Sequence, residues 1–144
     1  MKKIIPYLLF LTIFITSCEK DDCPNPISTC GNSGIITTDN VYNAITSENY
    51  TISAVALNGN CLSVTYGSSG CDASTWITNL YSTNNFFSVF PLQREAKLEV
   101  ITNQLCGAVF QKTVLFDLTS FQISGQNQIP INLLGWSQQI IYNY

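Results

Sequence analysis

The alternation of apolar and polar residues in short segments, separated by turn residues, most constrains the fold of this chain. In residues 61–66, Leu62, Val64 and Tyr66 fall on one face and the residues between them on the other. A period of two is typical of a β-strand with one buried face. Beyond the first 17 residues, no helical period extends over about a dozen residues. The sequence therefore predicts a fold built from strands.

Turn residues divide the chain into seven or eight short strands. The predicted strands are residues 51–57, 61–66, 75–82, 96–100, 109–118, 129–134 and 138–142, with 86–92 as an edge strand or a connection because it contains Pro91. Asn58-Gly59-Asn60 predicts a hairpin between the first two strands. This spacing predicts an all-β fold, an antiparallel β-sandwich of the immunoglobulin-like, Greek-key kind. A barrel is the alternative, since the strand pattern alone does not separate the two.

The N-terminus has the composition of a secretory signal. Lys2 and Lys3 precede an apolar run over residues 4–15, which is shorter than the roughly 20 residues that a spanning helix needs. Ile15-Thr16-Ser17-Cys18 resembles the lipobox of bacterial lipoproteins, in which the cysteine thiol receives a diacylglycerol and the peptide is cut before that cysteine. The resemblance implies a signal peptide over residues 1–17, lipidation of Cys18 and membrane lipid as a partner. The alternative is an ordinary signal with a chance cysteine at its end.

Charged residues directly after the lipobox refine the expected location. Glu19, Lys20, Asp21 and Asp22 look like the surface-export signal of Bacteroidota lipoproteins, a lysine followed by acidic residues. This implies an outer-membrane protein exposed at the cell surface, with the periplasmic face as the alternative. The simpler interpretation is the solvated start of a tether.

Composition divides the remaining chain into two parts. Residues 18–34 are rich in Asp, Pro, Ser, Asn and Gly and are predicted to form a lipidated, flexible tether. Residues 35–144 are then the β-sandwich domain, a length that suits one hydrophobic core.

Charge and residue types exclude several classes of function. The formal net charge is −3 and becomes −5 once Lys2 and Lys3 are removed with the signal, which leaves no basic surface for nucleic acid. The chain has no histidine, so Ser-His-Asp catalysis, Cys-His catalysis and histidine metal sites are excluded. There is also no C-x2-C pair for a structural zinc ion. We therefore predict no catalytic residues, no metal and no cofactor.

Six cysteines are present, and lipidation of Cys18 leaves five, which cannot all pair within one chain. Cys71 follows the turn 67–70, and Cys106 lies in a turn between two strands. Because both lie at strand ends, where a bridge can join neighbouring loops, we predict a Cys71–Cys106 disulfide, which can persist outside the cytoplasm. The remaining cysteines are Cys23, Cys30 and Cys61. Any two of these three could form a disulfide, and the sequence does not decide which pair does.

Acidic and aromatic residues are the remaining candidates for function. Glu95 and Glu99 share one strand face, and a solvated, charge-balanced face is the simpler interpretation than a pair of catalytic acids. Asp117 is expected to bond to backbone or a turn. Trp76 and Trp136 are candidates for a sugar-stacking platform, with core packing as the simpler interpretation. We expect Trp136 to be the more exposed, since it follows a glycine in a turn.

Four motifs follow one another along residues 51–134. They are Val64-Thr65-Tyr66-Gly67-Ser68-Ser69-Gly70-Cys71, Asn103-Gln104-Leu105-Cys106, Val114-Leu115-Phe116-Asp117-Leu118 and Ile129-Pro130-Ile131-Asn132-Leu133. Together they resemble a family of small uncharacterised Bacteroidota lipoproteins. The chain departs from the family after Cys71, where many members have Lys-Glu-His and this chain has Asp72-Ala73-Ser74, so any ligand role of that histidine is absent here. The resemblance implies fold and location, because the family carries no established activity.

These observations predict a lipid-anchored protein of the cell envelope that is not an enzyme and acts by binding or by envelope interaction. A glycan-binding accessory lipoprotein is the first alternative and requires exposed aromatic rings. A hydrolase with two carboxylates facing a shared cleft is the second. A protease inhibitor of immunoglobulin-like shape is the third, and it requires protruding loops at one end.

Overall fold

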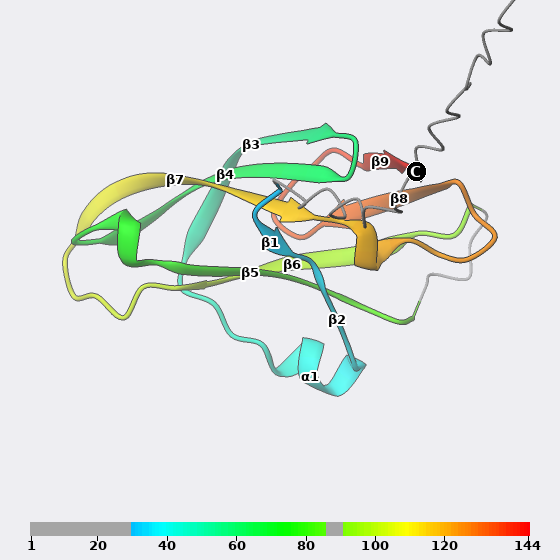
Figure 1. The fold of residues 1–144 in the computed structure, drawn as a ribbon. Coiled ribbons are helices and arrows are strands. Elements are labelled where there is room, and N and C mark those ends of the chain that lie inside the picture. The colour runs from blue at the N-terminus through cyan, green and yellow to red at the C-terminus, as the bar shows by residue number, and fades with distance from the viewer. Residues whose placement is uncertain (1–29, 86–90) are drawn as a thin grey trace, which may run out of the picture.

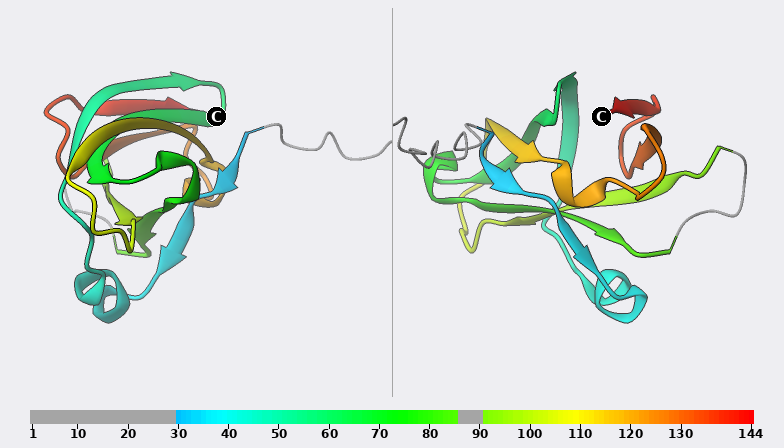
Figure 2. Two further views of the ribbon diagram at one scale, coloured as in Figure 1. Left: turned by 90° about the vertical axis from the view of Figure 1, so that its left-hand side faces the viewer. Right: turned by 45° about the vertical axis from the view of Figure 1, so that its right-hand side comes forward.

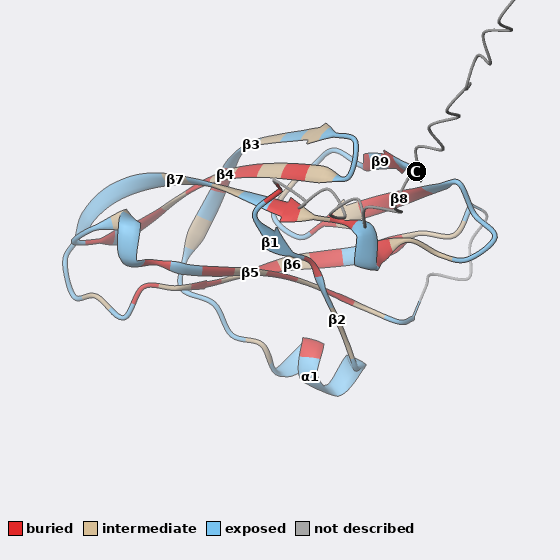
Figure 3. Cartoon of the chain, in the orientation of Figure 1, coloured by how far each residue is buried: buried red, intermediate tan, exposed pale blue. Residues whose placement is uncertain are grey.

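The alternation along β4 (Cys61–Gly70) buries one face of this strand completely. In the computed structural model, which describes residues 30–85 and 91–144, Leu62, Val64 and Tyr66 are fully buried. β6 (Arg94–Ile101) alternates in the same way, with Leu98 and Val100 turned inward. Figure 3 shows buried and less buried residues alternating along β4. The two inner faces meet to form the core.

Two sheets pack against each other (Figures 1 and 2). The four-stranded sheet has the order β1-β7-β4-β3, with β1 at Asn32–Ser33, β7 at Ala108–Asp117 and β3 at Tyr50–Asn58. The five-stranded sheet has the order β2-β5-β6-β8-β9, with β2 at Ile35–Thr37, β5 at Ile77–Thr83, β8 at Gln128–Leu133 and β9 at Ile140–Asn143. The predicted all-β sandwich is therefore confirmed.

Both sheets are mixed, whereas the sequence predicted antiparallel pairing. The pairs β1–β7, β2–β5 and β6–β8 are parallel, and the remaining pairs are antiparallel. The N-terminal segment produces two of the parallel pairs because it joins β7 first and then crosses to β5 in the other sheet. Parallel pairing is evenly spaced but slanted, and it leaves no hairpin signal in the sequence.

The predicted strands from residue 50 onward are present, with small shifts at their ends. The hairpin at Asn58-Gly59-Asn60 is formed, and Gly59 has the positive φ of 56° that glycine adopts without steric cost. Residues 73–75, predicted in part as strand, form a short 3₁₀ turn, η1 (Ala73–Thr75), and a second, η2, covers Thr119–Phe121. Of the predicted segment 86–92, residues 86–90 lie outside the described residues.

A short helix, α1 (Asp39–Ala44), is absent from the sequence prediction because six residues are too few to show a helical period. Thr38 caps it by accepting a hydrogen bond from the backbone N–H of Val41 at 3.5 Å. Its buried Tyr42 donates to Glu95 at 3.0 Å, and the ammonium of Lys97 lies 4.5 Å from the centre of the Tyr42 ring. The helix is therefore held onto the outer face of β6 by side chains.

Residues 30–34, which lie within the predicted tether, are part of the folded structure. Cys30 is buried and forms a disulfide with Cys61, one of the three pairings that the sequence left open. Directly after it, a Cβ atom added at Gly31 would clash with the backbone carbonyl oxygen of Leu115, so only glycine fits this close approach. The N–H of Gly34 donates to the carbonyl oxygen of Asp117 at 2.8 Å.

Several predicted features of the N-terminus lie outside the described residues. They are the signal peptide 1–17, the lipidation site Cys18, the export signal 19–22 and Cys23. Within residues 30–85 and 91–144, no helix has the length and apolar character needed to cross a bilayer.

Removal of the Cys30–Cys61 bridge is expected to destabilise the fold. The two cysteines are 31 positions apart, and closing a loop of this length contributes roughly 3–4 kcal/mol on the chain-entropy model. The double variant Cys30→Ala, Cys61→Ala should therefore lose about 3–4 kcal/mol of unfolding free energy in urea titrations under non-reducing conditions. A loss below about 1 kcal/mol would contradict the constraint on the unfolded chain.

Candidate functional site

The site lies at the end of the sandwich remote from the N-terminal segment. β4 and β7 pair over ten positions, from Cys61 opposite Asp117 at one end to Gly70 opposite Ala108 at the other. The N-terminal segment joins the first end through Cys30. The connections 71–76 and 102–107 leave from the second end, about 30 Å away along the strands. They lie at the left of Figure 1, and Figure 2 (left) views the molecule from this end.

A disulfide joins these two connections. Cys71, the first residue after β4, is bonded to Cys106 in the β6–β7 connection, with the two Cα atoms 5.0 Å apart. The predicted pairing is therefore confirmed. Its physical reason is the one used in the prediction: both cysteines stand at strand ends that the sheet packing brings together.

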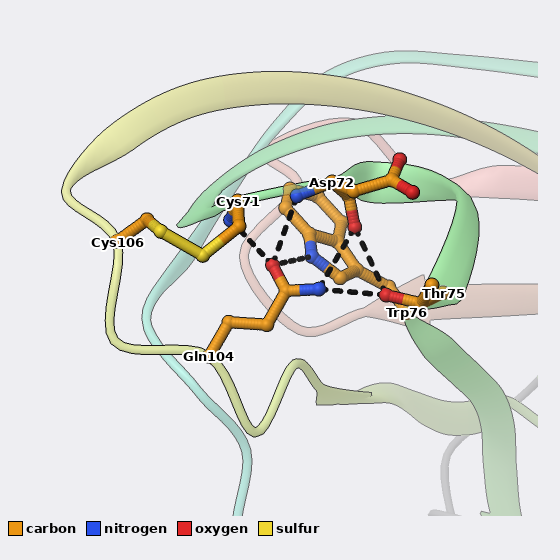
Figure 4. Close-up of a disulfide and its surroundings, with 6 residues drawn as sticks. All are labelled: Cys71, Asp72, Thr75, Trp76, Gln104 and Cys106. Atoms are coloured by element: carbon orange, nitrogen blue, oxygen red, sulfur yellow. Dashed lines mark hydrogen bonds between the residues drawn. A yellow bond between two sulfur atoms is a disulfide. The ribbon is translucent and has the colours of Figure 1, made fainter.

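The side chain of Gln104 forms a second link between the same two connections (Figure 4). Its carbonyl oxygen accepts hydrogen bonds from the backbone N–H groups of Cys71 at 2.5 Å and Asp72 at 3.1 Å, and from the indole N–H of Trp76 at 3.3 Å. Its amide nitrogen donates to the carbonyl oxygen of Asp72 at 3.0 Å and to the hydroxyl of Thr75 at 2.6 Å. One glutamine thus holds the whole 71–76 connection, and we refer to these five bonds as the Gln104 clamp.

Asp72 has a structural role within this connection. Its carboxylate accepts hydrogen bonds from the backbone N–H of Ser74 at 2.9 Å and from the Ser74 hydroxyl at 2.6 Å. Both bonds favour the charged form and lower the pKa of the Asp72 carboxyl. The carboxylate therefore caps η1 and is ionised at neutral pH.

The predicted platform of Trp76 and Trp136 is not open to solvent in the structure. Trp76 is only 3% exposed, and its ring stacks on Tyr66 with the ring centres 6.0 Å apart. Trp136 is half-buried and packs against the core, because Gly135 with a φ of 85° turns the chain back toward it. Both tryptophans therefore pack against the core, as the simpler interpretation of the sequence predicted.

Leu105, between the clamp residue and the disulfide, is the most exposed large apolar residue among those described. Its relative accessible surface is 105%, and that of Val109, just beyond the disulfide, is 75%. Asn103 has a φ of 48°, in the left-handed region that asparagine adopts more readily than most residues. We call residues 102–107 the clamped loop.

Sequence reasoning did not single out Leu105 as a candidate residue. Its signal was an apolar side chain within a polar turn, directly before a cysteine. That signal becomes informative only when the disulfide and the neighbouring connection are known, because exposure depends on the tertiary structure.

A shallow groove of about 530 Å³ runs from this end along the two sheets. It lies between residues 76–79 of β5 with its preceding turn and residues 112–115 of β7. Its polar groups already bond across it: Lys112 donates to the carbonyl oxygen of Trp76, and Asn32 donates to that of Thr78 at 3.3 Å. The groove therefore links the two sheets through its own side chains.

The acidic residues named from the sequence hold structural contacts. Glu99 accepts from Asn79 at 2.8 Å, and Glu95 accepts from the tyrosine of α1 as described above. Asp117 accepts from the backbone N–H of Thr119 at 2.9 Å, the turn contact that the sequence predicted. In the part of the chain that the structure describes, no three residues of His, Cys, Asp or Glu are grouped for a metal ion.

Comparison with known proteins gives the fold alone. The chain matches no protein-family model and no curated protein. Two solved structures are similar: a protein of unknown function DUF1344 from Bacteroides vulgatus ATCC 8482, at 16% identity and a TM-score of 0.54, and a putative toxin related protein from Parabacteroides distasonis ATCC 8503, at 10% identity and a TM-score of 0.54. They match 80% and 78% of this chain, which spans 57% and 59% of their lengths. Both similar structures come from bacteria of the genera Bacteroides and Parabacteroides, and the likeness concerns the fold.

Loss of the Gln104 clamp is expected to loosen the 71–76 connection without unfolding the core. Gln104→Ala removes five hydrogen bonds, of which water replaces most at this surface, so we expect a loss of about 1–3 kcal/mol. Amide hydrogen exchange at Cys71 and Asp72 should accelerate, while exchange in β4 and β6 stays slow.

Gln111→Ala is the matched control, since this exposed glutamine of β7 belongs to no clamp. It should leave the exchange at Cys71 and Asp72 unchanged. Equal acceleration in both variants would show that the clamp does not hold the connection.

Proposed function

We propose that this chain is a lipid-anchored protein of the cell envelope, without enzymatic activity, that presents the clamped loop to a protein partner. The observation that carries the proposal is the opposition of two ends: the N-terminal segment joins one end of β4, and the clamped loop with its exposed leucine lies at the other. A body anchored at the first end directs the second away from the membrane.

The spacing between the lipobox and the folded part limits how far the body can lie from the membrane. Cys18 precedes the bridged Cys30 by twelve residues, which span at most about 40 Å when fully extended. Two or three acyl chains on Cys18 would make the anchor effectively permanent, since each buried methylene contributes about 0.8 kcal/mol. Residues 19–22, in which Lys20 is followed by two aspartates, support display at the cell surface, with the periplasmic face of the outer membrane as the alternative.

The chemistry of the side chains supports a role without catalysis. The chain has no histidine to act as a base near neutral pH. Glu95, Glu99 and Asp117 accept hydrogen bonds that hold α1, β5 and a turn in place. These contacts favour a structural use of the carboxylates over an acid pair.

The rigidity and composition of the clamped loop support binding to a protein. A disulfide and the clamp order residues 102–107 before any encounter, which lowers the entropic cost of association. Leu105 offers apolar area that only a partner surface can bury. A glycan partner is less well supported, because the ring face of Trp76 is buried against Tyr66.

The anchor is tested by Cys18→Ala. This variant lacks the thiol that receives diacylglycerol, so we expect it to leave the membrane fraction for the soluble fraction and to lose the acyl mass from its N-terminal peptide. Cys23→Ala is the matched control and should stay in the membrane fraction. Retention of Cys18→Ala in the outer membrane, with no acyl chains on the parent protein, would contradict the anchor.

The binding end is tested by photo-crosslinking on intact cells. A photoreactive amino acid at position 105 should yield a covalent adduct with a discrete partner protein. The same amino acid at position 134 is the control, because Leu134 is also exposed but belongs to the β8–β9 turn. Identical adducts from both positions, or none from position 105, would contradict a binding role for the clamped loop.

A further inference from the structure

We infer that the clamped loop is an inhibitory loop for a serine endopeptidase, with Leu105 in the enzyme's apolar specificity pocket and the Leu105–Cys106 peptide bond at its catalytic serine. This inference rests on the proposed binding role of the same loop and names the class of partner. Three observations carry it: the exposure of Leu105, the absence of charged residues within the clamped loop, and the attachment of the residues on both sides of Leu105 to one connection.

The exposure of Leu105 meets the first requirement of such a loop. A protease recognises its substrate by binding one side chain in a specificity pocket. That side chain belongs to the residue on the N-terminal side of the cleaved bond. The side chain of Leu105 is fully exposed, and no described residue packs over it. A single protruding leucine fits a deep apolar pocket better than it fits a flat surface.

The composition of the loop selects the kind of pocket. Residues 102–107 contain no charged residue, so a pocket with a carboxylate at its base would bury that charge without a partner, which is costly. An apolar slot accepts leucine and gains the area that it buries.

The two neighbours of Leu105 are both fixed to the 71–76 connection. Gln104, on one side, makes the five hydrogen bonds of the clamp. Cys106, on the other side, is covalently bonded to Cys71. If the bond between Leu105 and Cys106 were cut, both new chain ends would therefore remain side by side. Figure 4 shows the two attachments converging on the same connection.

This retention changes the outcome of proteolysis. When the serine hydroxyl of the protease attacks the carbonyl carbon of Leu105, a C–O ester bond forms and the C–N bond to Cys106 breaks. The hydroxyl proton passes through the protease's histidine to the nitrogen of Cys106. In an ordinary substrate this amine diffuses away and water cleaves the ester.

Here the disulfide holds the amine of Cys106 in place. The amine attacks the ester again, which restores the peptide bond and returns the proton to the serine. Because both groups are held together, religation is favoured as an intramolecular reaction over hydrolysis by water. The protease then remains occupied, and the loop acts as an inhibitor.

Other exposed apolar residues lack this arrangement. Leu134 is 56% exposed in the β8–β9 turn, where no disulfide or clamp flanks it in the described structure. It serves as the matched control position. At a surface turn without such attachments, we expect the protease either to cleave the chain after the leucine as a substrate or not to bind it.

The test uses the purified full-length chain in mild detergent with chymotrypsin and subtilisin, whose pockets are apolar, and with trypsin, whose pocket is acidic. The chain should inhibit hydrolysis of a small chromogenic substrate by at least one of the first two in a one-to-one ratio, and should leave trypsin active. Leu105→Arg should transfer inhibition to trypsin, a change in relative affinity on the order of 100-fold or more. Leu134→Arg should produce no transfer.

The disulfide supplies an independent readout. Cys71→Ala, Cys106→Ala, with its fold verified by circular dichroism, should be cut at position 105 and released with repeated turnover, since the amine is no longer held. Absence of inhibition of both chymotrypsin and subtilisin overturns the inference, as does repeated cleavage of the parent chain or of Leu105→Arg. A crosslinked partner of position 105 that is not a protease also overturns it, but leaves the proposed binding role intact.

Discussion

The packing of one face of β4 into the core is the interaction on which the rest of the structure depends. Leu62, Val64 and Tyr66 lie fully buried between the two sheets, and their packing fixes the strand in position and register. Cys61 begins this strand and Cys71 follows its end, so each disulfide is attached to the same rigid element. The N-terminal segment and the clamped loop are therefore connected through a single ordered strand rather than through separate loops.

Local alternation explains how much of this arrangement the sequence predicts. The period of two along β4 and β6 identifies the inner residues because each strand presents one face to the core. The Cys71–Cys106 bridge follows from two cysteines at strand ends. In contrast, β1 and β2 contain two and three residues, too few for any pattern. Their pairing arises from tertiary contacts, such as the close approach of Gly31 to the backbone of Leu115.

Burial of polar groups marks a second limit of sequence reasoning. Arg94 belongs to the few cations of the chain, yet it is 3% exposed, and its guanidinium donates to the carbonyl oxygen of Phe121 at 2.7 Å. Burial lowers the pKa of this group, because desolvation disfavours the charged form. Trp76 is similar in that its indole N–H reaches the clamp while its ring packs on Tyr66. The hydrogen-bond partners of Arg94 and Trp76 come from segments distant in the sequence, so no local sequence pattern predicts them.

The two disulfides stabilise opposite ends of the sandwich. The Cys30–Cys61 bridge attaches the N-terminal segment covalently to β4, next to the two-residue strand β1, which pairs with β7 at only two positions. The Cys71–Cys106 bridge orders a loop whose exposed Leu105 gains nothing from the core. An apolar side chain left in water lowers no free energy in the isolated chain. In the proposed function a protein partner buries this side chain, and the loop itself is held by the disulfide and the Gln104 clamp.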